Sequence, residues 1–457
     1  MSFPRYPAYQ ASGVEGGQEV PLHWSPIRLE RVVGLNPSKS EVRGADPDSE
    51  VSFLPMEAIG ERGELDLSRT RSISELLSSG YSYFKDGDVV FAKITPCFEN
   101  GKGALIQGLP RGFGFGTTEL IVLRPMRNRL IATFLDYLVR SDYFRRIGES
   151  RMYGAGGQKR VPDAYVRGYY FALPPLEEQK AIAAFLDRET AKIDGLIAEQ
   201  ERLIELLKEK RQAVISHGVT KGVNEGAVKK HSGVQWIGEI PQKWTVCEVR
   251  RVVNQIEQGW SPECLGRHAE LSEWGVLKTG CVNYGRFAEQ ENKALPDDLT
   301  PATEYEVRPG DVIMSRANGS PELVGATAIV ESVRPRLMLS DKLFRFGFGK
   351  DLDPRFFVLI FNARYMRAQI ERAISGAEGL ANNLPQSALK SFVLALPPMA
   401  EQSEIVKRIS AKLQEIDRLG GEAATYIALA QERRSALITA AVTGQIDVRG
   451  LAEQKAA

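Results

Sequence analysis

The amino-acid sequence predicts an α+β protein: two mixed α/β domains, each followed by one long helix, with the two helices forming an antiparallel coiled coil. Three observations lead to this fold class. The sequence repeats itself, two proline-free stretches show helical periodicity, and the stretches before them are rich in glycine, proline and short β-type runs.

The internal repeat keeps a fixed register over most of its length. Leu173–Gln179 reads Leu-Pro-Pro-Leu-Glu-Glu-Gln, and Leu396–Gln402 reads Leu-Pro-Pro-Met-Ala-Glu-Gln. Nearer the N-terminus Trp24 matches Trp244 at a slightly shorter offset, so a short insertion separates the two blocks. The chain is therefore predicted to consist of two copies of one unit, related by a pseudo-two-fold axis.

The repeat divides the chain into four segments. Two mixed domains are expected at 1–172 and 228–395, because short strand-like runs there are punctuated by turn residues. The first long helix with its linker is expected at 173–227, and the second with a C-terminal tail at 396–457. One further helix is expected in each mixed domain, near residues 130–147 and 354–374.

The long helices are expected at residues 176–217 and 399–441, where apolar residues recur at spacings of three and four. Leu186, Ile193 and Leu207 lie seven or fourteen positions apart, which predicts a heptad seam. A helix of this kind rises about 60 Å at 1.5 Å per residue, and its apolar stripe needs a partner. We expect that partner to be the other copy, although each helix could instead pack on its own domain.

Charge and composition limit the function. The chain has 59 basic and 58 acidic residues, a net charge of +1, which argues against a protein that binds DNA tightly by itself. It has no apolar run long enough to span a membrane and no secretory signal, and its four cysteines lack paired spacing. A cytoplasmic protein is expected.

Catalytic motifs are missing from the sequence. It has no Gly-x-x-x-x-Gly-Lys-Ser/Thr phosphate loop and no Asn/Asp-Pro-Pro-aromatic segment of an amino-methyltransferase. Cys264 and His268 have metal-like spacing, but no second pair accompanies them. We therefore predict no catalytic residue and no metal site in this chain.

The duplicated helix start resembles that of type I restriction-modification specificity subunits. A Leu-Pro-Pro-Leu-x-Glu-Gln-x-x-Ile start occurs twice, with Met399 in place of the second leucine, and Ser232–Trp244 is similar to the family's lead-in to a second recognition domain. The resemblance implies two target-recognition domains, each reading one half of a split, asymmetric DNA site. It also implies that the paired helices set the spacing and dock two modification (methyltransferase) subunits, which restriction subunits then join. No cofactor is expected in this chain; S-adenosylmethionine, ATP and Mg are expected on the partner subunits.

Two kinds of polar segment are candidates for DNA contact. Between Arg140 and Tyr170 seven basic residues accompany three acids, and the Gly-rich loop Tyr153–Arg160 lies among them; its counterpart is Ser375–Leu384. The second kind follows the strand-like run of each copy. The residues predicted to contact DNA are Lys93, Asn100, Lys102, Arg151, Tyr153, Gln158, Lys159, Arg160, Arg316, Asn318, Asn382 and Asn383. For any one of them a role as a solvated turn residue explains the pattern equally well.

Two other functions stay open at this point. The first is a coiled-coil interaction scaffold whose globular domains bind peptides. The second is an enzyme with an unrecognised site, which catalytic activity of the isolated chain would support.

Overall fold

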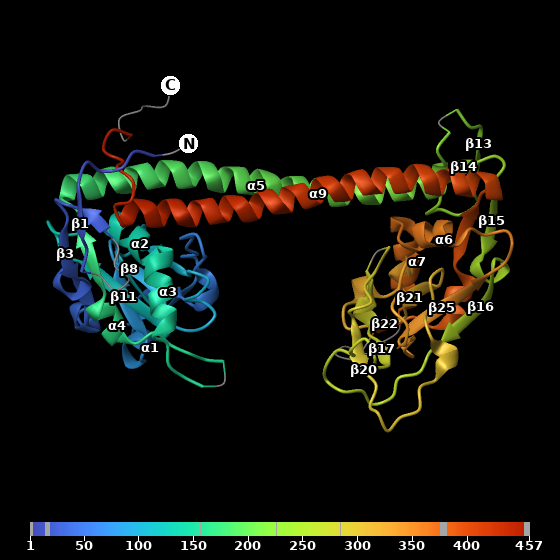
Figure 1. Cartoon of the computed structure of the whole chain (residues 1–457), viewed down its shortest axis with the longest axis horizontal. Coiled ribbons are helices and arrows are strands. Elements are labelled where there is room, and N and C mark those ends of the chain that lie inside the picture. Colours follow the sequence, from blue (N-terminus) through green and yellow to red (C-terminus); the bar gives the residue numbers. More distant parts are fainter. Residues whose placement is uncertain are drawn as a thin grey trace. The chain divides into compact units, whose positions relative to one another are not determined.

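Two units make up the chain, one of residues 1–200 and 425–457 and the other of residues 201–424. A computed structural model describes residues 3–13, 19–155, 157–224, 226–283, 285–374 and 382–451. Each of the two long helices contributes to both units, and the rest of each unit is a mixed α/β domain (Figure 1).

The described part of the first unit has two four-stranded sheets. One consists, in spatial order, of β6 (Thr70–Ser72), β5 (Glu50–Leu54), β10 (Phe113–Gly116) and β7 (Ser82–Lys85). The other consists of β4 (Val33–Leu35), β11 (Leu120–Pro125), β8 (Val89–Ala92) and β9 (Gly103–Leu105). Two short pairs are β1 (Tyr9–Ala11) with β2 (Glu19–Pro21), and β3 (Ser25–Arg28) with β12 (Tyr170–Leu173). The helices of this domain are α1 (Ile73–Ser78), α2 (Ala132–Arg140), α3 (Asp142–Ser150) and α4 (Asp163–Gly168).

The second unit repeats the main sheet. Its order is β16 (Val253–Gln258), β25 (Leu343–Phe348), β21 (Val312–Ser315) and β23 (Thr327–Ile329). A three-stranded sheet has the order β20 (Asn292–Ala294), β17 (Gly275–Leu277) and β24 (Leu337–Met338). The short pairs are β13 (Lys229–His231) with β14 (Glu239–Pro241), β15 (Thr245–Glu248) with β27 (Val393–Leu396), β18 (Val282–Asn283) with β19 (Arg286–Phe287), and β22 (Ala317–Asn318) with β26 (Asn382–Asn383). The helices are α6 (Pro354–Phe361), α7 (Arg364–Ala373) and α8 (Gln386–Ser391).

Burial explains why the central strands form where they do. All four residues of β8 are buried, as are all four of β21, which is typical of strands covered on both faces. In the first unit α2 lies against β8, β9 and β11, and its Phe134, Leu135 and Leu138 belong to the buried core. In the second unit α6 packs on β23. These sheets therefore give each unit a core of its own.

The single helix expected in each domain is wrong, because each region forms two helices. In the first unit the chain turns at Ser141, which has extended backbone angles and accepts a hydrogen bond from the Phe144 N–H at 3.3 Å. A serine in this position ends α2 and caps the start of α3. In the second unit the break between α6 and α7 falls at Asn362 and Ala363.

The long helices begin and end close to the predicted residues. Helix α5 spans Leu176–Lys221 with 46 residues, and α9 spans Met399–Val442 with 44. Each starts directly after a diproline, since proline is accepted in a first helical turn and not further inside.

A buried glutamine fixes each helix start to its own domain. The Gln179 Nε2 donates to the Pro174 carbonyl at 2.9 Å and the Arg129 carbonyl at 3.1 Å, and its Oε1 accepts from the Ile131 N–H at 2.9 Å. Ile131 is the residue that precedes α2, so one side chain satisfies groups of both elements.

Gln402 repeats this arrangement in the second unit. Its Nε2 donates to the Pro397 carbonyl at 2.9 Å and the Asp351 carbonyl at 2.8 Å, and its Oε1 accepts from the Asp353 N–H at 2.8 Å. Both glutamines are fully buried. The glutamine of the repeated motif thus has a structural role.

Parts of α5 and α9 contact one another inside each unit. In the first unit Arg434 of α9 pairs with Asp194 of α5 at 2.9 Å, and in the second Arg211 of α5 pairs with Asp417 of α9 at 2.7 Å. The two ion pairs join equivalent positions of the repeat, because Asp417 matches Asp194 and Arg434 matches Arg211 in its register.

The apolar stripe differs in part from the expectation. Ile182, Leu186, Ile197 and Leu207 are buried, whereas Leu196, which follows the same spacing of three and four residues, is 43% exposed. Leu203 and Leu206 are also exposed. The buried positions of α5 therefore form a narrower stripe than the periodicity indicates.

Candidate nucleic-acid interface

The two candidate segments of the first domain lie side by side. After β8 ends at Ala92 the chain continues into Lys93 and Ile94, and Ile94 forms a β-bridge with Arg160. The Val161 N–H donates to the Lys93 carbonyl at 2.8 Å. Loop Tyr153–Arg160 closes on itself, since Tyr153 and Arg160 exchange two backbone hydrogen bonds of 3.1 and 2.8 Å.

The second domain brings its two candidate segments together in the same way. Here β22 pairs with β26, so that Ala317 faces Asn383 and Asn318 faces Asn382. The Leu384 N–H donates to the Arg316 carbonyl at 2.9 Å. These contacts repeat those of Ile94 with Arg160 and of Lys93 with Val161, in the register of the internal repeat.

Among the candidate side chains of the first domain, two form hydrogen bonds within the domain and several are exposed. Asn100 Nδ2 donates to Glu61 Oε1 at 3.0 Å, and Lys102 Nζ donates to the Met56 carbonyl at 3.3 Å. Tyr153 is 64% exposed. Gln158 and Lys159 on the loop are exposed as well, and so is Arg151, which precedes the loop.

Arg160 is fixed by an acid that the sequence does not single out. Its Nε and Nη2 donate to the two carboxylate oxygens of Glu119, each at 2.9 Å. These hydrogen bonds lower the pKa of Glu119 and raise the pKa of Arg160. A fork-to-fork pair holds a guanidinium in one orientation, so Glu119 positions Arg160 and with it the base of the loop.

Candidates of the second domain are partly engaged. Arg316 Nη1 donates to the Asp341 carbonyl at 3.2 Å, and its guanidinium lies 5.7 Å from the centroid of the Phe344 ring. Asn318 Oδ1 accepts from the Ser320 N–H at 3.1 Å. Asn382 Nδ2 donates to the Asn318 carbonyl at 3.4 Å. Residues 375–381 of the predicted loop Ser375–Leu384 lie outside the described residues.

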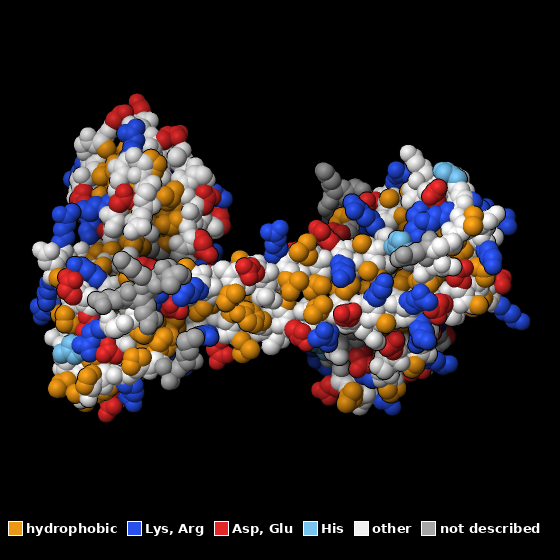
Figure 2. All heavy atoms as spheres, turned by 90° about the horizontal axis from the view of Figure 1, so that it is seen from above, with side chains coloured by type: hydrophobic (Ala, Val, Ile, Leu, Met, Phe, Trp, Pro, Cys, Tyr) orange, Lys and Arg blue, Asp and Glu red, His pale blue; other side chains and the backbone are white. Residues whose placement is uncertain are grey.

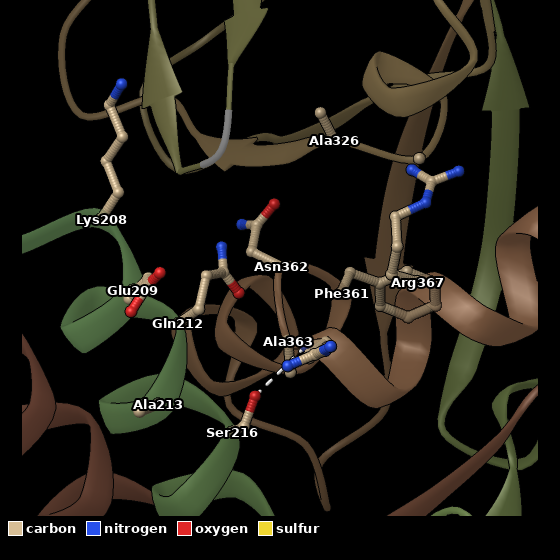
Figure 3. A pocket seen from close by; sticks show the side chains of 12 residues that line it. Lys208, Glu209, Gln212, Ala213, Ser216, Ala326, Phe361, Asn362, Ala363 and Arg367 are labelled. Carbon is tan, nitrogen blue, oxygen red and sulfur yellow. Dashed lines mark hydrogen bonds between the residues drawn. The ribbon is translucent and has the colours of Figure 1, made fainter. Parts of the chain in front are cut away.

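Another cavity of the second unit lies away from these segments. It has a volume of about 800 Å³ and lies between α5, through Lys208, Gln212 and Ser216, and the domain around Asn362 and Arg367 (Figure 3). Ser216 Oγ accepts from the Arg364 N–H at 3.2 Å. Its side chains include no pair typical of acid–base or nucleophilic catalysis.

Other kinds of site find little support in the described ranges. No cluster there has three or more His, Cys, Asp or Glu side chains placed to hold a metal ion. The four cysteines are free thiols. No helix in those ranges is long and apolar enough to cross a bilayer.

Comparison with known proteins identifies the family. The specificity subunit of the type I restriction enzyme EcoEI from Escherichia coli is 30% identical over 489 aligned positions, covering 90% of this chain and 81% of that one. The EcoKI specificity subunit of Escherichia coli strain K12 is 26% identical over 76% of this chain and 72% of its own length. No family model matches the chain.

Solved structures share the fold. A chain from a study of complex assembly and conformational transition of the type I R-M system aligns with a TM-score of 0.70 at 19% identity, over 93% of this chain and 99% of that one. The HsdS subunit from Thermoanaerobacter tengcongensis aligns with a TM-score of 0.51 at 20% identity, over 94% and 99% of the two chains.

The chain therefore belongs to the specificity subunits of type I restriction enzymes. The prediction of a DNA-targeting component, as opposed to a catalytic one, is confirmed by this membership. The mixed α/β content with two long helices is confirmed as well.

Proposed function

We propose that this subunit reads a bipartite, asymmetric DNA site, one half with the domain at 1–172 and the other with the domain at 228–395. The observation that carries the proposal is the backbone pairing that joins two polar segments in each unit, at Ile94 with Arg160 and at Ala317 with Asn383. The paired segments form a small frame from which polar side chains can reach a groove.

The two halves of the site should differ because the two frames carry different side chains. Arg160 is replaced by Asn383 and Lys93 by Arg316 at equivalent backbone positions. Arginine and lysine favour guanine edges, whereas asparagine favours adenine. The two domains thus share the backbone pairing but differ in the side chains that it positions.

We infer further that the chain is two copies of one unit and that α5 and α9 form an antiparallel coiled coil, which sets the spacing between the half-sites. The matched ion pairs Asp194–Arg434 and Arg211–Asp417 support this inference. The segments 173–227 and 396–457 then act as a spacer.

Exposed apolar side chains on the two long helices indicate a surface that binds partner proteins. Leu196 and Leu429 in the first unit, and Leu203 and Leu206 in the second, are all more than a third exposed, and such side chains lie along the helices in Figure 2. We propose that two modification subunits dock there and that restriction subunits join them in the cytoplasm. S-adenosylmethionine, ATP and Mg would bind to those subunits.

A selection experiment tests the proposal. The full chain, assembled with its modification subunit, is incubated with duplexes of random sequence, and the retained duplexes are sequenced. We expect two different short motifs at a fixed spacing. Retention without sequence preference would instead favour the interaction scaffold.

A further inference from the structure

A lysine-lined pocket of about 460 Å³ lies beside Arg316 in the second domain. Lys278, Lys293 and Lys342 line it, together with Ser261, Glu263 and Ser340. It adjoins the candidate interface directly, because the Lys342 carbonyl accepts from the Arg316 N–H at 2.9 Å. The sequence does not predict these lysines as a site, because they lie far apart in the chain and belong to no common motif.

Two of the three lysines form no ion pair with another described residue of the chain. Lys278 Nζ lies 2.9 Å from Glu291 Oε2 and is neutralised there. Lys293 and Lys342 are exposed, and within the described part of the chain neither forms an ion pair. Glu263 is the one acid among the described lining residues, which include three lysines. The Asp341 carboxylate next to them accepts a hydrogen bond from the Ser261 hydroxyl.

A buried hydroxyl provides a second, independent observation. Ser340 is 4% exposed, and its Oγ has no hydrogen-bond partner among the described residues. A buried hydroxyl without a partner costs free energy, and Ser340 is one of the residues that line the pocket.

At the equivalent place the first domain carries an acid instead of a lysine. Glu119 stands where Lys342 stands in the second domain, since the Lys93 N–H donates to the Glu119 carbonyl just as Arg316 donates to that of Lys342. The Glu119 carboxylate pairs with Arg160. Thr117, the counterpart of Ser340, accepts from the Glu119 N–H at 3.3 Å. The positive charge of Lys342 is therefore not repeated at Glu119 in the first domain.

We propose that this pocket binds a backbone phosphate of the DNA next to the half-site that the second domain reads. This inference rests on the proposed function. Lysine ammonium groups bind phosphate as point charges. A phosphate bound there anchors the second domain on the duplex and leaves base reading to Arg316 and the asparagines.

The salt dependence of DNA binding tests the pocket. The full chain with its modification subunit binds a duplex of random sequence, and affinity is measured at several salt concentrations for wild type, K293Q/K342Q and a control, K350Q/K390Q. The control removes two exposed lysines that do not line the pocket. One lost phosphate contact lowers the slope of log affinity against log salt by about 0.9.

We expect K293Q/K342Q to lower the slope of log affinity against log salt by about one, and to lower the affinity at low salt by about tenfold. The control K350Q/K390Q should keep the wild-type slope. The K293R/K342R variant should restore the slope, and equal melting temperatures should show that all variants fold. Equal salt slopes in K293Q/K342Q and the control would overturn the inference, even if the wild-type protein selects a DNA sequence.

A second arm separates DNA from free phosphate. Inorganic phosphate is titrated against each protein at constant ionic strength. If it displaces the duplex from wild type only at concentrations far above those of the DNA phosphates, the pocket serves DNA. Tight binding of inorganic phosphate with an unchanged DNA slope would overturn the proposal. Wild type that shows no DNA selection at all would refute the proposed function instead.

Discussion

At the scale of single residues, the repeated Leu-Pro-Pro motif owes its glutamine to hydrogen bonding. Gln179 and Gln402 each satisfy two carbonyls and one N–H where a long helix leaves its domain. The sequence predicts a helix start at this motif but not the partner groups, because Arg129 and Asp351 lie far from the glutamines in sequence.

Gln179→Ala should destabilise the first unit. The change leaves the Ile131 N–H and two carbonyls without their partner in a buried place, which costs about 1–3 kcal/mol. The measurement is the thermal unfolding midpoint of the full chain. Glu177→Ala, at a position 84% exposed in the same motif, is the matched control and should leave the midpoint almost unchanged. Equal effects of the two changes would contradict the role of Gln179.

The Glu119–Arg160 pair should make loop Tyr153–Arg160 sensitive to acid. Because the pKa of Glu119 is lowered in the folded protein, the pair stabilises the fold fully above the ordinary glutamate pKa of about 4.3. That stabilisation is lost as the pH falls through the lowered value.

Glu119→Gln tests this pH dependence by hydrogen exchange at the Tyr153 and Arg160 amides, corrected for intrinsic rates. At neutral pH exchange should be faster in the variant than in wild type, and the difference should shrink in acid. A difference independent of pH would mean that the carboxylate charge does not hold the loop.

At the scale of elements, periodicity predicts the long helices well and their buried face less well. Leu196 and Ile197 are neighbours, yet Leu196 is 43% exposed and Ile197 is fully buried. The spacing of apolar residues cannot separate a face that packs inside the protein from one that faces a partner, since both are apolar.

Ile197→Ala should therefore lower the free energy of unfolding by about 2–5 kcal/mol, because it opens a cavity in a packed position. Leu196→Asp should change stability little and weaken assembly with the modification subunit by about tenfold. Unfolding by denaturant and co-purification measure the two effects. Reversed outcomes would show that Leu196 belongs to the helix pair.

The equivalent ion pairs give a prediction for the isolated first half. In a fragment of residues 1–227, Asp194 of one copy should pair with Arg211 of a second copy, as Asp194 pairs with Arg434 and Asp417 with Arg211 in the full chain. The fragment should dimerise. Asp194→Arg should weaken the dimer at least about tenfold, and the double change with Arg211→Asp should restore it. Analytical ultracentrifugation measures this, and a strictly monomeric wild-type fragment would refute the antiparallel pairing.

At the scale of the whole molecule, the repeat in the sequence predicts most of the fold. Both offsets of the repeat reappear in one pair of equivalent strand pairings: Leu173 faces Ser25, and Leu396 faces Thr245. The helix breaks at Ser141 and Ala363 were not predicted, because a single capping residue inside an apolar run leaves the periodicity almost unchanged.

The candidate interface was predicted in part. The sequence selects Lys93 and Arg160, or Arg316 and Asn383, as separate candidates, and only the fold shows that they are neighbours. Lys293 and Lys342 were missed because isolated lysines carry no pattern until strands bring them to one pocket.

The most direct test that the two domains recognise different half-sites is a map of the bases that the assembled enzyme methylates on genomic DNA. We predict one asymmetric motif with two unlike halves and a fixed gap. In the N382A/N383A variant the sequence preference should weaken in only one half of the motif. In the R160A variant, which also leaves Glu119 without its partner, it should weaken only in the other half. A contiguous or palindromic motif, or variants that relax both halves together, would contradict the account.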